Sequence, residues 1–160
     1  MNFQRNLSNL ITLILVILTS ALFAPEVGAQ SNATIIIPSI EVNAPIVPVH
    51  IRAFPNGEVT WDVGGLHMTA GYFTGLPWFG SGSNTVLGGH SALAQGQADV
   101  FYRLDQVQIG DEVIAIENGN ERHYIVTNTY RANQHDLTPI YPTEHEQLTL
   151  ITCDLSSYNS

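Results

Sequence analysis

QLTLITC, the stretch from Gln147 to Cys153, alternates its side chains in the way that predicts a β-strand. Successive side chains of a strand point to opposite faces, so Thr149, Ile151 and Cys153 share one face. Cys153 is the only cysteine of the 160 residues, and the predicted strand ends on it. A thiol at a strand end lies at the rim of a sheet, as either a small apolar side chain or an accessible nucleophile.

Short strands separated by turns are predicted for most of the sequence before Gln147. Asn118 and Gly119 form a hairpin signal, because both residue types accept the positive φ angles of a tight turn. The pattern predicts an all-β barrel or sandwich with one or two short helices. The predicted strands before Gln147 are residues 34–37, 42–51, 84–87, 111–117 and 121–132.

Three segments have a more particular pattern. The apolar residues from Val100 to Val107 follow helical spacing and predict one short amphipathic helix. Pro45 and Pro48 interrupt a predicted strand and favour an edge or a bend over a central position. The glycine-rich segment 64–83 is predicted to be a long shaped loop.

Composition indicates one compact domain and excludes some partners. The chain has five basic and fourteen acidic side chains, a formal net charge of −9. No basic cluster is present in the sequence, so we expect no nucleic-acid partner. A hydrophobic content of 44% is too high for a disordered chain and ordinary for a single hydrophobic core.

Residues 1–30 have the pattern of a targeting segment, with a basic start at Arg5 and an apolar run from Leu10 to Ala24. A run of about 15 apolar residues is short for crossing roughly 30 Å of hydrocarbon, which favours a cleaved signal peptide. The alternative is a signal anchor that holds the protein at the membrane through residues 7–24. Either way, residues 31–160 are expected outside the cytoplasm, at the cell membrane or secreted.

His90 is the best base candidate among the six histidines, because it follows two glycines at the end of an apolar strand. There, missing side chains let another group approach the ring. The alternative is a histidine that merely caps the strand. The other histidines lie among polar or turn residues and are predicted to be solvated: His50, His67, His123, His135 and His145.

No metal or cofactor site is predicted. Glu144, His145 and Glu146 lie together, but no second histidine follows at the spacing of a helical zinc motif. In an exported protein cysteines usually pair, and Cys153 has no partner within the chain. Its unpaired state is consistent with a reactive thiol.

Four stretches in order resemble the sortase family of cysteine transpeptidases, in a class D/E-like form. They are IPSIEVNAPIV (37–47), NTVLGGHS (84–91), VFYRLDQVQIGDEVIAI (100–116) and TLITC (149–153), the last fitting the family signature TLxTC. The resemblance runs from about Thr34 to the last residue, so the sortase catalytic domain is expected at 31–160.

The resemblance implies an eight-stranded β-barrel with short helices and a reaction without cofactors. Cys153 would be the nucleophile, His90 its acid–base partner, and Thr152 would line the substrate groove. The protein substrate would carry a C-terminal sorting signal of the LPxTG kind, which the thiol cleaves to form a thioester. An amine of a cell-wall precursor or a pilin-like protein would then accept the acyl group.

The family pattern also includes an arginine on the strand after the cysteine, which binds substrate and steadies the oxyanion. That position would follow Ser160, and Arg103, Arg122 and Arg131 all precede Cys153. We therefore expect a domain truncated at its C terminus, with the last strand missing and a rate lowered about 100-fold to 1,000-fold.

Two alternative functions stay open at this stage. The first is a catalytically decayed surface module that binds peptides without processing them. The second is an L,D-transpeptidase, which fits less well because that family places glycine before its cysteine and Thr152 occupies this position here.

Overall fold

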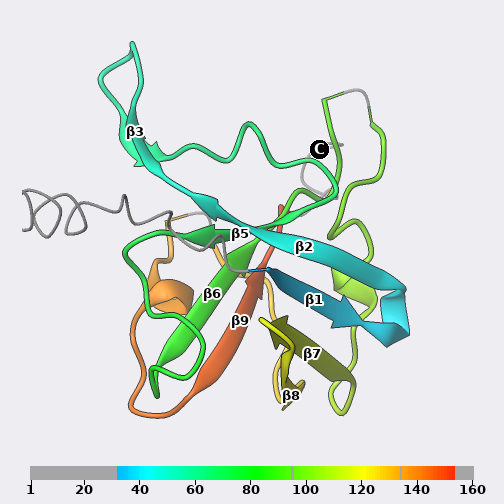
Figure 1. Cartoon of the computed structure of the whole chain (residues 1–160). Helices are drawn as coiled ribbons and strands as arrows, with labels where there is room; N and C mark the ends of the chain where they lie inside the picture. Colours follow the sequence, from blue (N-terminus) through cyan, green and yellow to red (C-terminus); the bar gives the residue numbers. More distant parts are fainter. Residues whose placement is uncertain (1–31, 95, 134, 154–160) are drawn as a thin grey trace, which may run out of the picture. The chain divides into compact units, whose positions relative to one another are not determined.

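The computed structural model describes residues 32–94, 96–133 and 135–153, and their architecture is all-β (Figure 1). The predicted fold class, a sortase-like barrel, is confirmed: seven strands form one nearly closed, barrel-like sheet, and a separate hairpin stands beside it. The strands are β1 (Ala33–Ile37), β2 (Val42–Val49), β3 (Ile51–Ala53), β4 (Val59–Trp61), β5 (Ala70–Phe73), β6 (Asn84–Gly88), β7 (Glu112–Glu117), β8 (Asn120–Ile125) and β9 (Gln147–Ile151).

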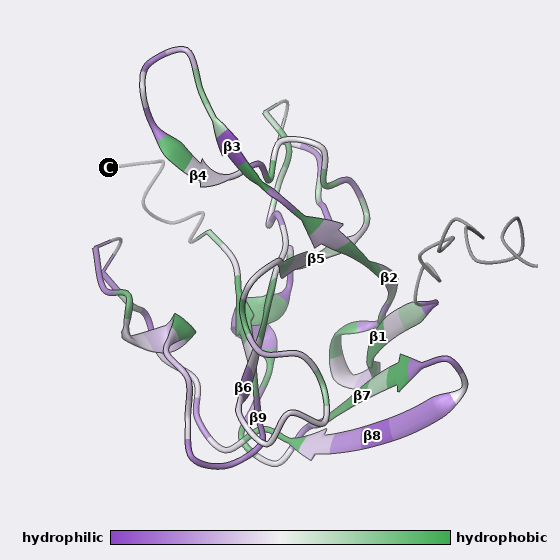
Figure 2. Ribbon diagram, turned by 60° about the vertical axis from the view of Figure 1, so that its left-hand side comes forward, coloured by the Kyte–Doolittle hydropathy of each residue, from purple (hydrophilic) through white to green (hydrophobic). Residues whose placement is uncertain are grey.

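The strand order in the large sheet is β8-β7-β1-β2-β5-β6-β9. The β2–β5 and β6–β9 pairs are parallel, and the other neighbours are antiparallel. β3 and β4 form the separate hairpin, which extends away from the large sheet (Figure 1). Figure 2 shows β8 as largely hydrophilic, and charged side chains on an outer strand oppose unwanted pairing with other chains.

The core lies inside the sheet, and β1 and β7 contribute alternate residues to it, whereas all five residues of β6 are buried. In β1 the buried side chains are Ala33, Ile35 and Ile37, and the residues between them are half-buried. β7 buries Val113 and Ala115 in the same way. This alternation is what the pleat of a half-buried strand requires.

The predicted hairpin at Asn118 and Gly119 is confirmed, with φ angles of 50° and 83° at the two turn residues. The edge position predicted for the strand with two prolines is wrong, because β2 lies between β1 and β5. Pro45 pairs only toward β1 and Pro48 only toward β5. Each proline therefore has a paired neighbour on only one side of β2. On its other side no ladder bond is lost through the missing N–H group of proline.

The helix predicted from Val100 to Val107 is wrong. The segment forms turns and a 3-10 helix, η2 (Leu104–Gln106), with backbone bonds such as Leu104 N–H to the Phe101 carbonyl at 3.1 Å. Phe101, Leu104 and Val107 recur every three residues, which is the period of a 3-10 turn rather than of an α-helix. The other helices of the described chain are also of the 3-10 type: η1 (Pro38–Ile40) and η3 (Thr138–Ile140).

Two further boundaries differ from the prediction. The segment 64–83 is not one long loop, because β5 forms within it. A Cβ at Gly71 would lie 2.5 Å from a methyl group of Val49, so the glycine permits close packing in this strand. The strand predicted for 121–132 ends at Ile125.

The predicted targeting segment, residues 1–30, lies outside the described residues. Within the part of the chain that is described, no helix has the length and apolar character needed to cross a membrane.

Gly89→Ala should destabilise the fold, because the added Cβ would lie 2.5 Å from Val100 Cγ1 and 2.6 Å from Phe101 Cδ2. Both side chains are buried, and overpacking of this kind costs about 1–3 kcal/mol. Urea denaturation measures the change in the free energy of unfolding. Gly65→Ala is the matched control, since no atom lies within 4 Å of its added Cβ. Equal stability of the two variants would contradict the packing argument.

His123 should titrate above its ordinary value of 6.5, because hydrogen bonds to Glu112 and then Glu121 raise its pKa. Folding therefore gains from protonation of His123 below pH 6.5, and this gain is lost as the pH rises through the raised pKa. A proton NMR titration should show the midpoint falling in Glu112→Gln but not in Glu58→Gln. An unchanged midpoint in Glu112→Gln would rule out this ion pair as the cause.

Candidate active site

The parallel strands β6 and β9 both end two residues before a predicted reactive residue, His90 after β6 and Cys153 after β9. Their register is constant from Asn84 beside Gln147 to Gly88 beside Ile151, a separation of 63 residues at every step. The ladder itself ends at Gly88 and Ile151, and the same register continued for two more residues would set position 90 opposite position 153. A further backbone bond follows the end of β6, in which Gly89 N–H donates to the Ile151 carbonyl at 3.1 Å.

Side-chain hydrogen bonds fix the register at both ends of this pair. At the start, Thr149 Oγ1 donates to Asn84 Oδ1 at 2.7 Å, and Asn84 is buried. At the end, Thr152 Oγ1 donates to the Gly89 carbonyl at 2.9 Å. A slip of one residue would break both bonds and reverse the faces of the strand.

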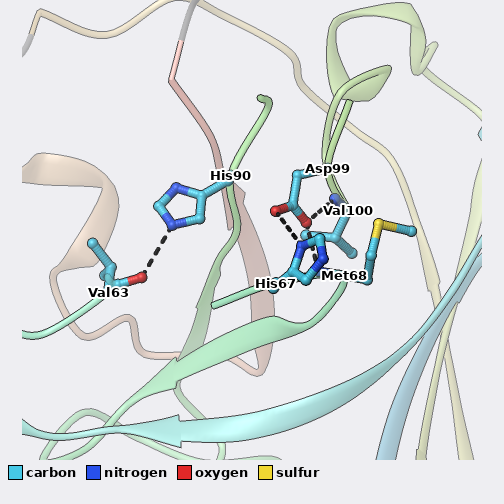
Figure 3. Close-up of polar contacts among 6 residues, drawn as sticks. All are labelled: Val63, His67, Met68, His90, Asp99 and Val100. Atoms are coloured by element: carbon cyan, nitrogen blue, oxygen red, sulfur yellow. Dashed lines mark hydrogen bonds and ion pairs between the residues drawn. The ribbon is translucent and has the colours of Figure 1, made fainter. Parts of the chain in front are cut away.

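The imidazole of His90 is held in one orientation by the backbone of another loop. Its Nε2 lies 3.0 Å from the carbonyl oxygen of Val63 (Figure 3). A carbonyl oxygen only accepts hydrogen bonds, so Nε2 carries the proton of this bond. In the neutral ring Nδ1 is therefore the nitrogen that can take up a proton.

The two glycines before His90 are explained by packing against the backbone. A Cβ at Gly88 would lie 2.6 Å from the ring of Phe73, and one at Gly89 would lie 2.6 Å from Phe101. The missing side chains thus admit two aromatic rings beside the strand end, rather than a group approaching the histidine ring itself. This close packing of the two rings determines the position of the end of β6 and therefore of His90.

Cys153 is exposed and free of any disulfide, as expected for an accessible thiol. Thr152, proposed from the family resemblance to line the groove, is half-buried, and its hydroxyl joins β9 to the end of β6. Arg103 and Arg122 form ion pairs with Glu41 and Glu146, at 2.7 Å and 3.6 Å.

Sequence reasoning missed the residues that support His90. They lie in the segment 62–69, here named the Val63 loop, and at Asp99, whose carboxylate binds that loop (Figure 3). The only local signal for a turn in this loop was Asp62, which precedes Gly64 by two residues. In the structure its carboxylate accepts the Gly64 N–H at 3.2 Å. An ion pair with Arg52 and this amide bond lower the pKa of Asp62.

Among residues 32–94, 96–133 and 135–153, no group of three or more His, Cys, Asp or Glu side chains is placed to hold a metal ion.

The family model described as a sortase domain matches residues 35–160, which include both strands of the site. The chain belongs to the sortase family. The family resemblance noted in the sequence is thereby confirmed, while its class D/E-like form stays a prediction. A search of curated proteins found no match.

Solved sortase structures share this fold. A lid mutant of sortase A from Corynebacterium diphtheriae is 26% identical, with a TM-score of 0.63, over 79% of this chain and 64% of that one. Sortase C1 from Streptococcus agalactiae, in complex with MTSET, is 26% identical, with a TM-score of 0.60, over 78% and 60%. Sortase C-1 from Actinomyces oris, 24% identical, supports the fold alone, with a TM-score of 0.64 over 86% and 72%. The chain therefore spans less than two thirds of the first two structures.

The native protein should react at Cys153 with a charged methanethiosulfonate reagent, because the residue is exposed two positions after the end of β9. Mass spectrometry should find one modification per chain without denaturant, and none in Cys153→Ser. Labelling that appears only after unfolding would show that the thiol is buried in solution.

Proposed function

We propose that this sortase-family chain is a cysteine transpeptidase that uses Cys153 and His90. The observation that carries the proposal is the constant register of β6 and β9, which leads both residues to the same end of the sheet. Family membership supports the same reaction class. An exposed thiol and a half-buried, oriented imidazole are the two groups that acyl transfer through a thioester requires.

In the proposed first step, the thiolate of Cys153 attacks the carbonyl carbon of the scissile peptide bond. The protonated His90 then donates a proton to the departing amine, and a thioester of Cys153 remains. In the second step an incoming amine attacks the thioester carbonyl and loses its proton to His90, which restores the thiolate and forms a new peptide bond. Two moderate barriers replace one high barrier.

The bond between His90 and Val63 gives each ring nitrogen its own task. Nε2–H stays bonded to the carbonyl at 3.0 Å, so the proton exchanged with sulfur and substrate is assigned to Nδ1. Proton transfer through a positioned histidine contributes about 100-fold to 10,000-fold to a rate.

The proposed substrate is a protein with an LPxTG-like sorting signal near its C terminus, and the acceptor is an amine of the cell surface, from a cell-wall precursor or a pilin-like protein. The proposed location is extracytoplasmic. These assignments rest on the resemblance of NTVLGGHS and TLITC to the family's motifs. Thr152 is proposed to border the groove through its place between the two strand ends.

Cys153→Ala should abolish cleavage of a fluorogenic LPxTG peptide, because it removes the sulfur that forms the thioester. His90→Gln should lower kcat/KM by about 100-fold to 10,000-fold. His145→Gln is the matched control, since it exchanges the same residue types at an exposed position of another loop. Mass spectrometry of the parent with peptide should also trap the acylated chain. Turnover by Cys153→Ala at the parental rate would refute the assignment.

A further inference from the structure

We propose that Asp99 is a positioning residue for His90, which sets the orientation of the imidazole by holding the Val63 loop in place. The orientation of the His90 ring by Asp99 follows from hydrogen bonds of the structure, and the effect of Asp99 on turnover rests on the proposed function. Asp99 lies in neither of the two strands that form the site and contacts the histidine ring only through other groups.

The carboxylate of Asp99 is a buried group whose donors come from two segments. Its Oδ1 accepts the backbone N–H groups of Met68 at 2.7 Å and of Val100 at 2.6 Å. Its Oδ2 lies 3.4 Å from Nδ1 of His67. Only 1% of the Asp99 side chain is exposed, whereas 66% of His67 is. The carboxylate therefore joins the end of the Val63 loop to the segment 99–101.

The same segment also holds the backbone of the histidine. Asp99 N–H donates to the Ser91 carbonyl and Phe101 N–H donates to the His90 carbonyl, both at 3.0 Å. Phe101 is fully buried, so this attachment is part of the core. Segment 99–101 thus binds His90 by its backbone and, through Asp99, binds the loop that orients its ring.

The Val63 loop needs an external attachment at its far end. The Val63 carbonyl accepts the Leu66 N–H at 3.1 Å as well as the His90 ring. Leu66 is buried, but Met68 is exposed and has a φ of 51°, a conformation that non-glycine residues seldom adopt. The bond from Met68 N–H to Asp99 compensates this strained end, and its loss would let the loop and the Val63 carbonyl move.

Burying a carboxylate costs free energy unless its oxygens accept hydrogen bonds. If Asp99 only stabilised its own turn, the bond to Val100 would be enough. The additional bonds to Met68 and His67 reach the Val63 loop across about thirty residues of sequence. Figure 3 shows these contacts on one side and the His90–Val63 bond on the other side of the same loop.

The test compares Asp99→Asn and Asp99→Ala with the parent by 15N NMR of the imidazole nitrogens in the full chain. His90→Gln assigns the His90 signals by their loss. The parent should show the Nε2–H tautomer in the neutral ring, because Nε2 donates to Val63. Asp99→Ala loses every acceptor and should shift toward a mixture of tautomers, whereas Asp99→Asn keeps an Oδ1 acceptor for Met68 and Val100 and should shift less. Where turnover is measured, kcat should fall about 100-fold while KM changes little.

Asp111→Asn is the matched control, because Asp111 also caps a turn, through the Gln108 N–H at 3.0 Å, without contact to the Val63 loop. It should leave the His90 signals and kcat as in the parent.

Unchanged His90 signals in a folded Asp99→Ala protein would overturn the inference. So would failure of both Asp99 variants to fold while Asp111→Asn folds, because Asp99 would then support the whole domain rather than the histidine. A parent that shows the expected tautomer and variant shifts but processes no peptide would refute the proposed function and leave the positioning role intact.

Discussion

The structure depends above all on the parallel pairing of β6 with β9. These strands are 63 residues apart in sequence, and the separation is the same at each of their five pairs. Parallel neighbours end on the same side of a sheet, and the proposed meeting of positions 90 and 153 depends on this pairing. Side-chain bonds from Thr149 to Asn84 and from Thr152 to Gly89 protect the register at its two ends. In the proposed site the placement of both reactive residues is therefore a consequence of register, and the TLITC stretch includes two residues that maintain it.

Packing beneath the strand end gives this register its rigidity. Phe73 and Phe101 approach the backbone where Gly88 and Gly89 lack side chains, and Phe101 belongs to the continuous apolar core. The end of β6 is consequently held from the interior, while Cys153 at the end of β9 is exposed. A nucleophile must be reached by a large substrate, whereas its base must keep a defined orientation. In the proposed function the fold meets both needs, because buried neighbours support the strand end before His90 and Cys153 is exposed.

Local patterns in the sequence were enough for the fold class, the hairpin at Asn118 and Gly119, and a last described strand that ends at Ile151 rather than at Cys153, because each depends on alternation or turn chemistry of adjacent residues. The segment from Val100 to Val107 was misjudged as a helix because a three-residue period and a 3.6-residue period are hard to separate over eight residues. Val63 and Asp99 could not be predicted at all. Their roles arise from a backbone carbonyl and a buried carboxylate that meet partners 27 and 31 residues away. No local composition encodes such contacts.

The candidate site thus consists of two groups of residues that are positioned by different interactions. The proposed reactive residues, His90 and Cys153, are positioned by strand register and were predicted from two short motifs. The supporting residues contribute polar groups that are satisfied only in the folded state, with Asp99 receiving donors from both the Val63 loop and its own segment. Because an unsatisfied buried carboxylate is costly, Asp99 favours the one arrangement in which all its donors are present. That arrangement also presents the Val63 carbonyl to His90. The hydrogen bonds of Asp99 that stabilise the loop therefore also orient the imidazole.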